Sequence, residues 1–209
     1  MCGRYYIDSD MEEGLQSLLV RIERQIRMSV DAGGDKEVPK RLIEGGRDIF
    51  PASVAPIVRV KEKKAGLESC TWGFPGFEKG QVLFNARSET VLDKERFRES
   101  VLKRRCLIPA AGFYEWSEKK EKYYFTLPEE RRVLLMAGFY KAFAEGGHFI
   151  ILTRQADDSV AGVHPRMPLI LDEDAAVEWL QNDASILKLL KADAPRLKRE
   201  KKGQLSLFD

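Results

Sequence analysis

Residues 105–116 read RCLIPAAGFYEW, an apolar run in which the only charged side chains are Arg105 and Glu115. We interpret this run as β-strand, because it is one of a series of short strand-like segments joined mostly by short turns. The other segments are VAPIVRV (54–60), LESCTWGF (67–74), QVLFNA (81–86), KYYFTL (122–127), VLLMAGFY (133–140) and HFIILT (148–153). So many short strands in succession predict an antiparallel sheet that curls into a barrel or sandwich.

Helical patterns surround this series of strands. Before it, apolar residues recur with a 3.6-residue period behind three N-cap candidates, Asp8, Ser9 and Asp10. A helix is also predicted at 93–105, and two closing helices at 172–181 and 184–190. The sequence therefore predicts an α+β fold, with a curved antiparallel or barrel-like sheet flanked by helices. Residues 1–194 form the expected domain, and 195–209 a basic, flexible tail.

Composition narrows the function classes. The 209 residues suit one domain, and the net charge of +2 means that a nucleic-acid partner would need a local basic surface. Three cysteines without a C-x-x-C spacing predict neither a disulfide framework nor a zinc site, and the two histidines form no metal-binding pattern. We expect no metal and no cofactor. The absence of a signal-peptide profile and of a membrane-length apolar run predicts a cytoplasmic protein.

Four stretches of the sequence contain residues that suggest chemistry, each with an ordinary alternative. Removal of Met1 would leave Cys2 with a thiol and a free α-amine side by side, although most cysteines at this position are inert. Strand alternation puts Asn85 and Arg87 on one face, which suits an oxygen-rich substrate but also an ordinary turn. Apolar neighbours would raise the pKa of Glu115, unless the strand is solvated there. His164 lies in a proline-stiffened loop and is either an acid–base group or structural.

Trp72 is flanked by glycine in a predicted turn. It is either a stacking platform for a nucleic-acid base or a core residue.

Four motifs in order, MCGRYY (1–6), FNARSET (84–90), RCLIPAAGFYEW (105–116) and HPRMPLIL (164–171), resemble the SOS response-associated peptidase (SRAP) family. The resemblance implies a curved antiparallel sheet with outer helices, and a cleft that senses abasic sites in single-stranded DNA. It also implies a covalent link between the N-terminal cysteine and the ring-opened sugar. By motif, Cys2 is then the nucleophile, Asn85 holds the N-terminus and the sugar, Glu115 shuttles protons and His164 assists ring opening.

The same resemblance implies that Arg4 and Arg87 contact phosphates, and Trp72, Thr153 and Arg166 complete the predicted DNA-binding set. The chemistry suits Cys2, because its amine can form an imine with an aldehyde and its thiol can then close a thiazolidine ring.

Two alternatives remain open. One is a cysteine peptidase that uses Cys2, His164 and Glu115. The other is a non-covalent single-strand binding module that holds DNA through Arg4, Arg87, Trp72 and residues 103–105. The family name also suggests that the protein removes its own Met1, a task that an aminopeptidase would perform equally well.

The C-terminal peptide QLSLF (204–208) resembles the short motifs by which bacterial repair proteins bind the replication sliding clamp. Gln204 would fix the register, while Leu205, Leu207 and Phe208 would supply the apolar contacts. The alternative is that this peptide packs on its own domain. We expect a monomer that acts in the cytoplasm in association with the nucleoid.

Overall fold

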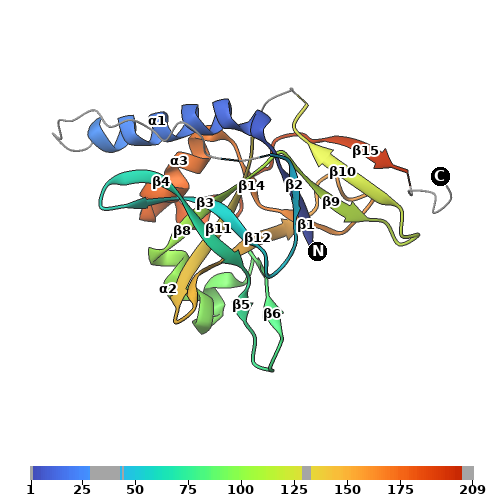
Figure 1. Ribbon diagram of the computed structural model, residues 1–209, viewed down its shortest axis with the longest axis horizontal. Helices are drawn as coiled ribbons and strands as arrows, with labels where there is room; N and C mark the ends of the chain where they lie inside the picture. The colour runs from blue at the N-terminus through green and yellow to red at the C-terminus, as the bar shows by residue number, and fades with distance from the viewer. Residues whose placement is uncertain (1, 29–42, 44, 129–132, 204–209) are drawn as a thin grey trace.

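A computed structural model describes residues 2–28, 43, 45–128 and 133–203. Its core is a closed barrel of five strands (Figure 1): β3 (Val54–Lys61), β4 (Lys64–Trp72), β8 (Arg105–Ala110), β11 (Leu134–Phe143) and β12 (Gly146–Gln155). The strands pair in the order β4, β3, β8, β11, β12, each antiparallel to the next. A parallel pairing of β12 with β4 closes the barrel. The barrel confirms the α+β prediction and its curved, barrel-like sheet.

Three short strands extend the barrel. β7 (Asn85–Arg87) pairs in parallel with β12, β13 (Arg166–Pro168) pairs with the end of β12, and β14 (Ile170–Leu171) pairs with β11. Two further strands, β5 (Phe74–Pro75) and β6 (Val82–Leu83), form a hairpin that projects from the body of the molecule (Figure 1). Because β6 leads directly into β7, the hairpin and the barrel together fix where β7 lies.

A second, five-stranded sheet lies beside the barrel on the right of Figure 1, in the order β15 (Lys198–Lys202), β10 (Lys122–Thr126), β9 (Gly112–Trp116), β1 (Arg4–Ile7), β2 (Arg47–Ile49). Only Ala111 separates β8 from β9, so residues 105–116 run from the barrel into this sheet. The amide of Ala111 donates to the carbonyl oxygen of Tyr6, 2.8 Å away, and ties the corner to β1. This apolar segment therefore joins the two sheets.

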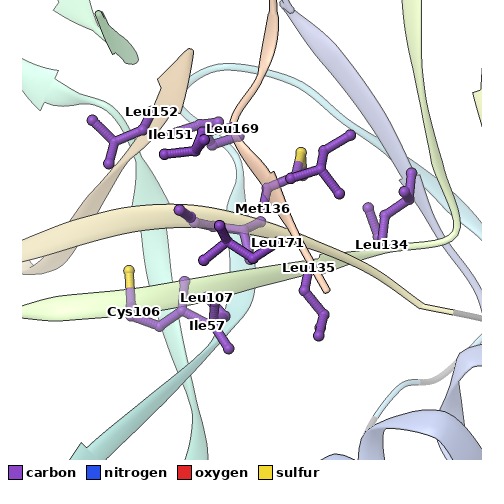
Figure 2. Close-up of a cluster of buried hydrophobic side chains, with 14 of the residues drawn as sticks. Ile57, Cys106, Leu107, Leu134, Leu135, Met136, Ile151, Leu152, Leu169 and Leu171 are labelled. Carbon is purple, nitrogen blue, oxygen red and sulfur yellow. The ribbon is translucent and has the colours of Figure 1, made fainter. Parts of the chain in front are cut away.

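Aliphatic side chains on both faces of the barrel strands form a buried cluster (Figure 2), among them Ile57, Leu107, Met136, Ile151 and Leu152, each fully buried. All six residues of β8 are buried, because one face lines the barrel and the other is covered by helices. A strand covered on both faces is apolar throughout, rather than alternating between apolar and polar residues. This explains why every residue of β8 after Arg105 is apolar.

The helices cover the outside: α1 (Glu12–Met28), α2 (Glu95–Lys103), α3 (Glu173–Gln181) and α4 (Ile186–Leu189), with 3₁₀ turns at Ser9–Met11, Val91–Asp93 and Asp183–Ser185. The apolar period of α1 is confirmed, since Leu15, Leu18, Leu19 and Ile22 are buried. The helix predicted at 93–105 is shorter than expected, because Arg105 already belongs to β8. Likewise only the last part of 184–190 is α-helical. No helix in the described ranges is long and apolar enough to cross a membrane.

The C-terminal segment differs from the expected flexible tail. Leu197 is buried, and β15 pairs antiparallel with β10 along its whole length. Arg199 lies over the ring of Tyr123, 5.8 Å from its centroid, and Lys201 forms a 2.6 Å ion pair with Glu121. The run of basic residues thus forms a charged edge strand, a type of edge that discourages pairing with other chains. Residues 204–209, including Gln204, Leu205, Leu207 and Phe208, lie outside the described residues.

Candidate active site

Cys2 lies two residues before the first residue of β1 and is fully buried. Its thiol is 3.7 Å from the backbone carbonyl oxygen of Arg4, the acceptor of its S–H. Burial, together with the negative charge of nearby Glu115, raises the pKa of the Cys2 thiol far above its ordinary value. The resting thiol is therefore protonated and needs a base before it can act as a nucleophile.

Asn85 holds the backbone of Cys2. Its side-chain nitrogen Nδ2 donates a 2.8 Å hydrogen bond to the carbonyl oxygen of Cys2, across 83 positions of sequence. The position of Asn85 is fixed by β7, in which Asn85 pairs with Ile151 of the barrel. The predicted alternation is confirmed, because Ala86 is buried while Arg87 is exposed. The amide oxygen Oδ1 of Asn85 is buried and accepts no hydrogen bond from the described residues.

Glu115 points to the inner side of the five-stranded sheet, where it is 3% exposed. Its neighbours on that face include Phe113 and Phe125, both fully buried. Burial raises the pKa of Glu115 from 4.5 to about 7, as the apolar letters around it predict, and the solvated alternative is wrong. A carboxyl group with this pKa exchanges protons readily near neutral pH.

His164 follows the turns at 157–163 and lies next to Glu115, with 3.8 Å between Nδ1 and Oε1 of the carboxyl group. The same Nδ1 lies 3.0 Å from both the backbone nitrogen and the carbonyl oxygen of Arg166, so the loop backbone fixes the ring. Burial lowers the pKa of His164, and the imidazole is neutral at physiological pH. Four distant motifs thus meet at one place through Cys2, Asn85, Glu115 and His164.

Trp72 is not a stacking platform. It is fully buried and packs against Tyr5, Phe84 and Phe149, with ring centroids 5.1, 5.6 and 6.4 Å away. Its indole Nε1 donates a 2.9 Å hydrogen bond to the carbonyl oxygen of Phe84, the residue before Asn85. The core alternative is correct, and the sequence did not reveal that Trp72 supports both β1 and β7 beneath the site.

Thr153 is also unable to touch DNA in this structure, because it is fully buried and its hydroxyl donates to the carbonyl oxygen of Ala86. This correction has the same cause as that for Trp72. Both side chains are fully buried by packing with other segments, whereas the sequence shows only that they are strand residues.

The three arginines of the predicted DNA-binding set differ. Arg87 is exposed, whereas Arg4 forms a 3.5 Å ion pair with Asp48. Arg166 makes two hydrogen bonds, of 2.6 and 2.9 Å, to the carboxylate of Glu89, and a third of 2.6 Å to the carbonyl oxygen of Thr153. A phosphate would compete with Glu89 for Arg166, whereas no carboxylate among the described residues forms an ion pair with Arg87.

An open cleft of about 720 Å³ borders the site. It runs between the end of β9, the start of β10 and the loop that carries His164, and its lining includes Trp116, Ser117, Tyr123 and Gly162. The cleft gives a substrate access to the histidine side of the buried cluster. Within the described ranges, no group of three potential metal ligands occurs.

Several proteins of known sequence resemble this chain. Abasic site processing protein YedK of Escherichia coli is 27% identical, over 88% of this chain and 82% of the relative. Abasic site processing protein YoaM of Bacillus subtilis is 26% identical, over 86% of this chain and 79% of the relative. Abasic site processing protein HMCES of Gallus gallus is 34% identical over a shorter region, 46% of this chain and 37% of the relative.

Solved structures share the fold. A phage-related protein from Bordetella bronchiseptica superposes with a TM-score of 0.70 at 23% identity, covering 97% of this chain and 95% of that one. A protein from Bacteroides thetaiotaomicron gives 0.68 at 21% identity, covering 96% and 91%. The model of the family described as SOS response associated peptidase (SRAP) matches residues 1–201, which include all four motifs and all but the last residue of β15. The chain belongs to the SRAP family.

Proposed function

We propose that this protein recognises abasic sites in single-stranded DNA and captures them covalently through Cys2, which shields the lesion during the response to DNA damage. The observation that carries the proposal is the convergence of Asn85, Glu115 and His164 on Cys2. The names of the relatives, abasic site processing proteins, support the same substrate.

The reaction begins after removal of Met1, which frees the α-amine of Cys2. An abasic deoxyribose opens from its cyclic hemiacetal to an aldehyde, and neutral His164 beside the cleft assists this opening by proton transfer. The amine adds to C1′ of the aldehyde, and loss of the resulting hydroxyl as water gives an imine. The thiol then adds across the C=N bond, with sulfur to carbon and hydrogen to nitrogen. The product is a thiazolidine, and one water is lost overall.

Glu115 supplies the proton movements in this scheme. It accepts a proton as the amine attacks and returns it to the departing hydroxyl, a cycle for which a pKa of about 7 is suited. The thiol of Cys2 is protonated at rest, and the imine nitrogen is the base that takes its proton as the sulfur closes the ring. Asn85 keeps the backbone of Cys2 in place through both steps, and its buried Oδ1 can accept a hydrogen bond from the amine or the sugar.

The two alternatives receive less support. A cysteine peptidase of the usual kind needs a thiolate paired with a histidine, whereas here burial keeps the thiol protonated and His164 lies against Glu115. The predicted non-covalent single-strand binder loses one of its contacts, because Trp72 is fully buried.

The proposal is tested by intact-mass measurement after incubation with a single-stranded oligonucleotide that carries one abasic site. We expect a species that lacks Met1 and is heavier by the oligonucleotide minus one water, and its loss in Cys2→Ala. Detection of the Met1-free protein with no adduct, under conditions where an aldehyde-reactive probe labels the oligonucleotide, would contradict the proposal.

We further propose that the peptide 204–208 binds the replication sliding clamp and brings the protein to forks in the nucleoid. Its support is the sequence pattern of Gln204, Leu205, Leu207 and Phe208 after a charged edge strand. Binding to purified clamp should be lost when the chain is truncated after Gly203. Equal binding by the truncated chain would refute the proposal.

A further inference from the structure

The five-stranded sheet has one face without aliphatic side chains. Strand register places its residues on a common side, which we call the outer face: Arg4, Tyr6, Asp48, Tyr114, Trp116, Lys122, Tyr124, Thr126, Lys198, Glu200 and Lys202. The opposite side carries Tyr5, Phe113, Glu115 and Phe125, all buried. The outer face is therefore an aromatic and charged surface that lies back to back with the catalytic Glu115.

The cations of the outer face are held over its rings. The ammonium group of Lys122 lies 4.0 Å from the centroid of Tyr114, and that of Lys202 lies 5.4 Å from the centroid of Tyr124. The two tyrosine rings are themselves in contact, with 4.8 Å between centroids. The guanidinium of Arg4 lies 5.3 Å from the ring of Trp116. Such cation–π contacts restrict long basic side chains to defined positions.

These cations also crowd one another. Lys122 and Lys202 are directly opposite in the β10–β15 register, an arrangement of like charges that destabilises a sheet. Burial lowers the pKa of Lys122, and the positive charges of Arg4 and Lys202 lower it further. Arg4 pairs with Asp48 and Lys202 with Glu200, but in the described part of the chain no carboxylate forms an ion pair with Lys122. An anion bound between the strands would relieve this repulsion.

We propose that the outer face binds the phosphate backbone of the DNA strand that flanks the captured lesion. This inference rests on the proposed function, and it assigns to Lys122 and Lys202 a contact beyond the cleft. Basic side chains interleaved with aromatic rings are the usual surface for single-stranded nucleic acid. The surface starts beside the site, because Arg4 is only two residues from Cys2 along the chain.

The direction of the strand follows from the register. Trp116, Lys122 and Lys202 are neighbours in one cross-strand row. With about 4.8 Å between adjacent strands, this row extends about 10 Å from Trp116 on β9 to Lys202 on β15, in the direction that leads away from Arg4 on β1. A strand that leaves the site past Arg4 thus meets Lys122 first and Lys202 next. The contact adds affinity for long oligonucleotides without a role in the chemistry at Cys2.

The test is charge reversal of the pair, Lys122→Glu with Lys202→Glu. The control reverses Lys61 and Lys64, another directly opposed lysine pair, which lies at the exposed end of the β3–β4 hairpin. The substrates are a 20-nucleotide strand with a central abasic site and a trinucleotide with the same lesion. We expect the crosslinking rate constant on the long strand to fall about tenfold at low salt. Its dependence on log salt should become shallower by about 1.4, the value for two lost phosphate contacts.

The trinucleotide should react equally with the wild type and the Lys122/Lys202 variant, and the control pair should change neither rate. The inference is overturned by an unchanged rate on the long strand, by an equal loss on both substrates, or by an equal loss in the control. If the wild type forms no crosslink, the proposed function fails by itself. The outer face is then tested by fluorescence anisotropy, which measures binding to an undamaged 20-nucleotide strand. We expect weaker binding by the Lys122/Lys202 variant than by the wild type, and unchanged binding by the control variant. If circular dichroism shows that the double variant is unfolded, the same measurements are made on the milder single variant Lys122→Gln.

Discussion

The side-chain nitrogen of Asn85 donates a 2.8 Å hydrogen bond to the backbone carbonyl oxygen of Cys2. This contact places the N-terminal segment inside the protein, next to a buried carboxyl group, before any substrate arrives. In the proposed reaction, capture of an abasic site then costs little reorganisation of the chain, because the proposed nucleophile is already in position.

Removal of the Asn85 amide should therefore reduce the rate and leave the protein folded. In Asn85→Ala the carbonyl of Cys2 loses its donor, and we expect crosslinking to slow by about 10- to 100-fold, the usual effect of a misplaced reacting group. The measurement is the single-turnover rate on an abasic oligonucleotide, with thermal unfolding as the check on folding. A rate within a factor of two of the wild type would remove Asn85 from the positioning role.

Trp72 should act on the same rate through Asn85. In Trp72→Phe the ring remains but the hydrogen bond from Nε1 to the carbonyl oxygen of Phe84 is lost. Trp179→Phe is a matched control, because Trp179 is equally buried and its Nε1 also donates to backbone carbonyls, those of Cys106 and Gly138. Both variants should lose about 1–3 kcal/mol of the free energy of unfolding, and only Trp72→Phe should crosslink more slowly.

The double variant Trp72→Phe with Asn85→Ala separates positioning from general destabilisation. If Trp72 acts by fixing Asn85, the second substitution adds little to the loss already caused by Asn85→Ala. Fully multiplicative rate losses would show that Trp72 acts by another route.

Glu115 should make stability and rate depend on pH in opposite ways. Its folded-state pKa is raised from 4.5 to about 7, so within that window the folded state keeps a proton that the unfolded state has released. The free energy of unfolding should then fall as pH rises through the window, by about 3 kcal/mol. Glu115→Gln should abolish this dependence, which urea denaturation at a series of pH values would reveal.

Crosslinking should show the reverse trend, because the base form of Glu115 is needed to accept a proton. We expect the single-turnover rate to rise as pH passes about 7 and this inflection to disappear in Glu115→Gln. The same inflection in wild type and variant would assign the proton transfer to another group.

Two substitutions can show whether this protein or a methionine aminopeptidase removes Met1. Serine is as small as cysteine, so we expect a methionine aminopeptidase to trim Met1 before either residue, whereas self-processing by Cys2 and Glu115 would use the thiol. If the protein removes its own Met1, Cys2→Ser and Glu115→Ala should both retain it after expression, and the intact mass gives the answer directly. Complete trimming of both variants would assign the step to the aminopeptidase.

The periodicity of apolar residues was sufficient to predict strands between residues 54 and 153, the amphipathic helix α1 and the α+β class, because these features depend on local pattern. The apolar letters around Glu115 indicated a raised pKa, because its neighbours in sequence are also its neighbours on the strand, but the solvated alternative was excluded only by the burial of Glu115 in the folded protein. Motif resemblance was sufficient for the family and for the four residues that meet at Cys2.

Tertiary structure alone decided which strand residues are covered on two faces. It buried Trp72 and Thr153, which the sequence offered as DNA contacts, and it bound Arg166 to Glu89, a partner 77 positions away. It also turned the basic segment at 198–202 from an expected tail into an edge strand. Barrel closure, strand order and register depend on contacts between segments far apart in the chain. Local pattern fixes which residues form strands, but only packing fixes which strands become neighbours and which side chains remain in solvent.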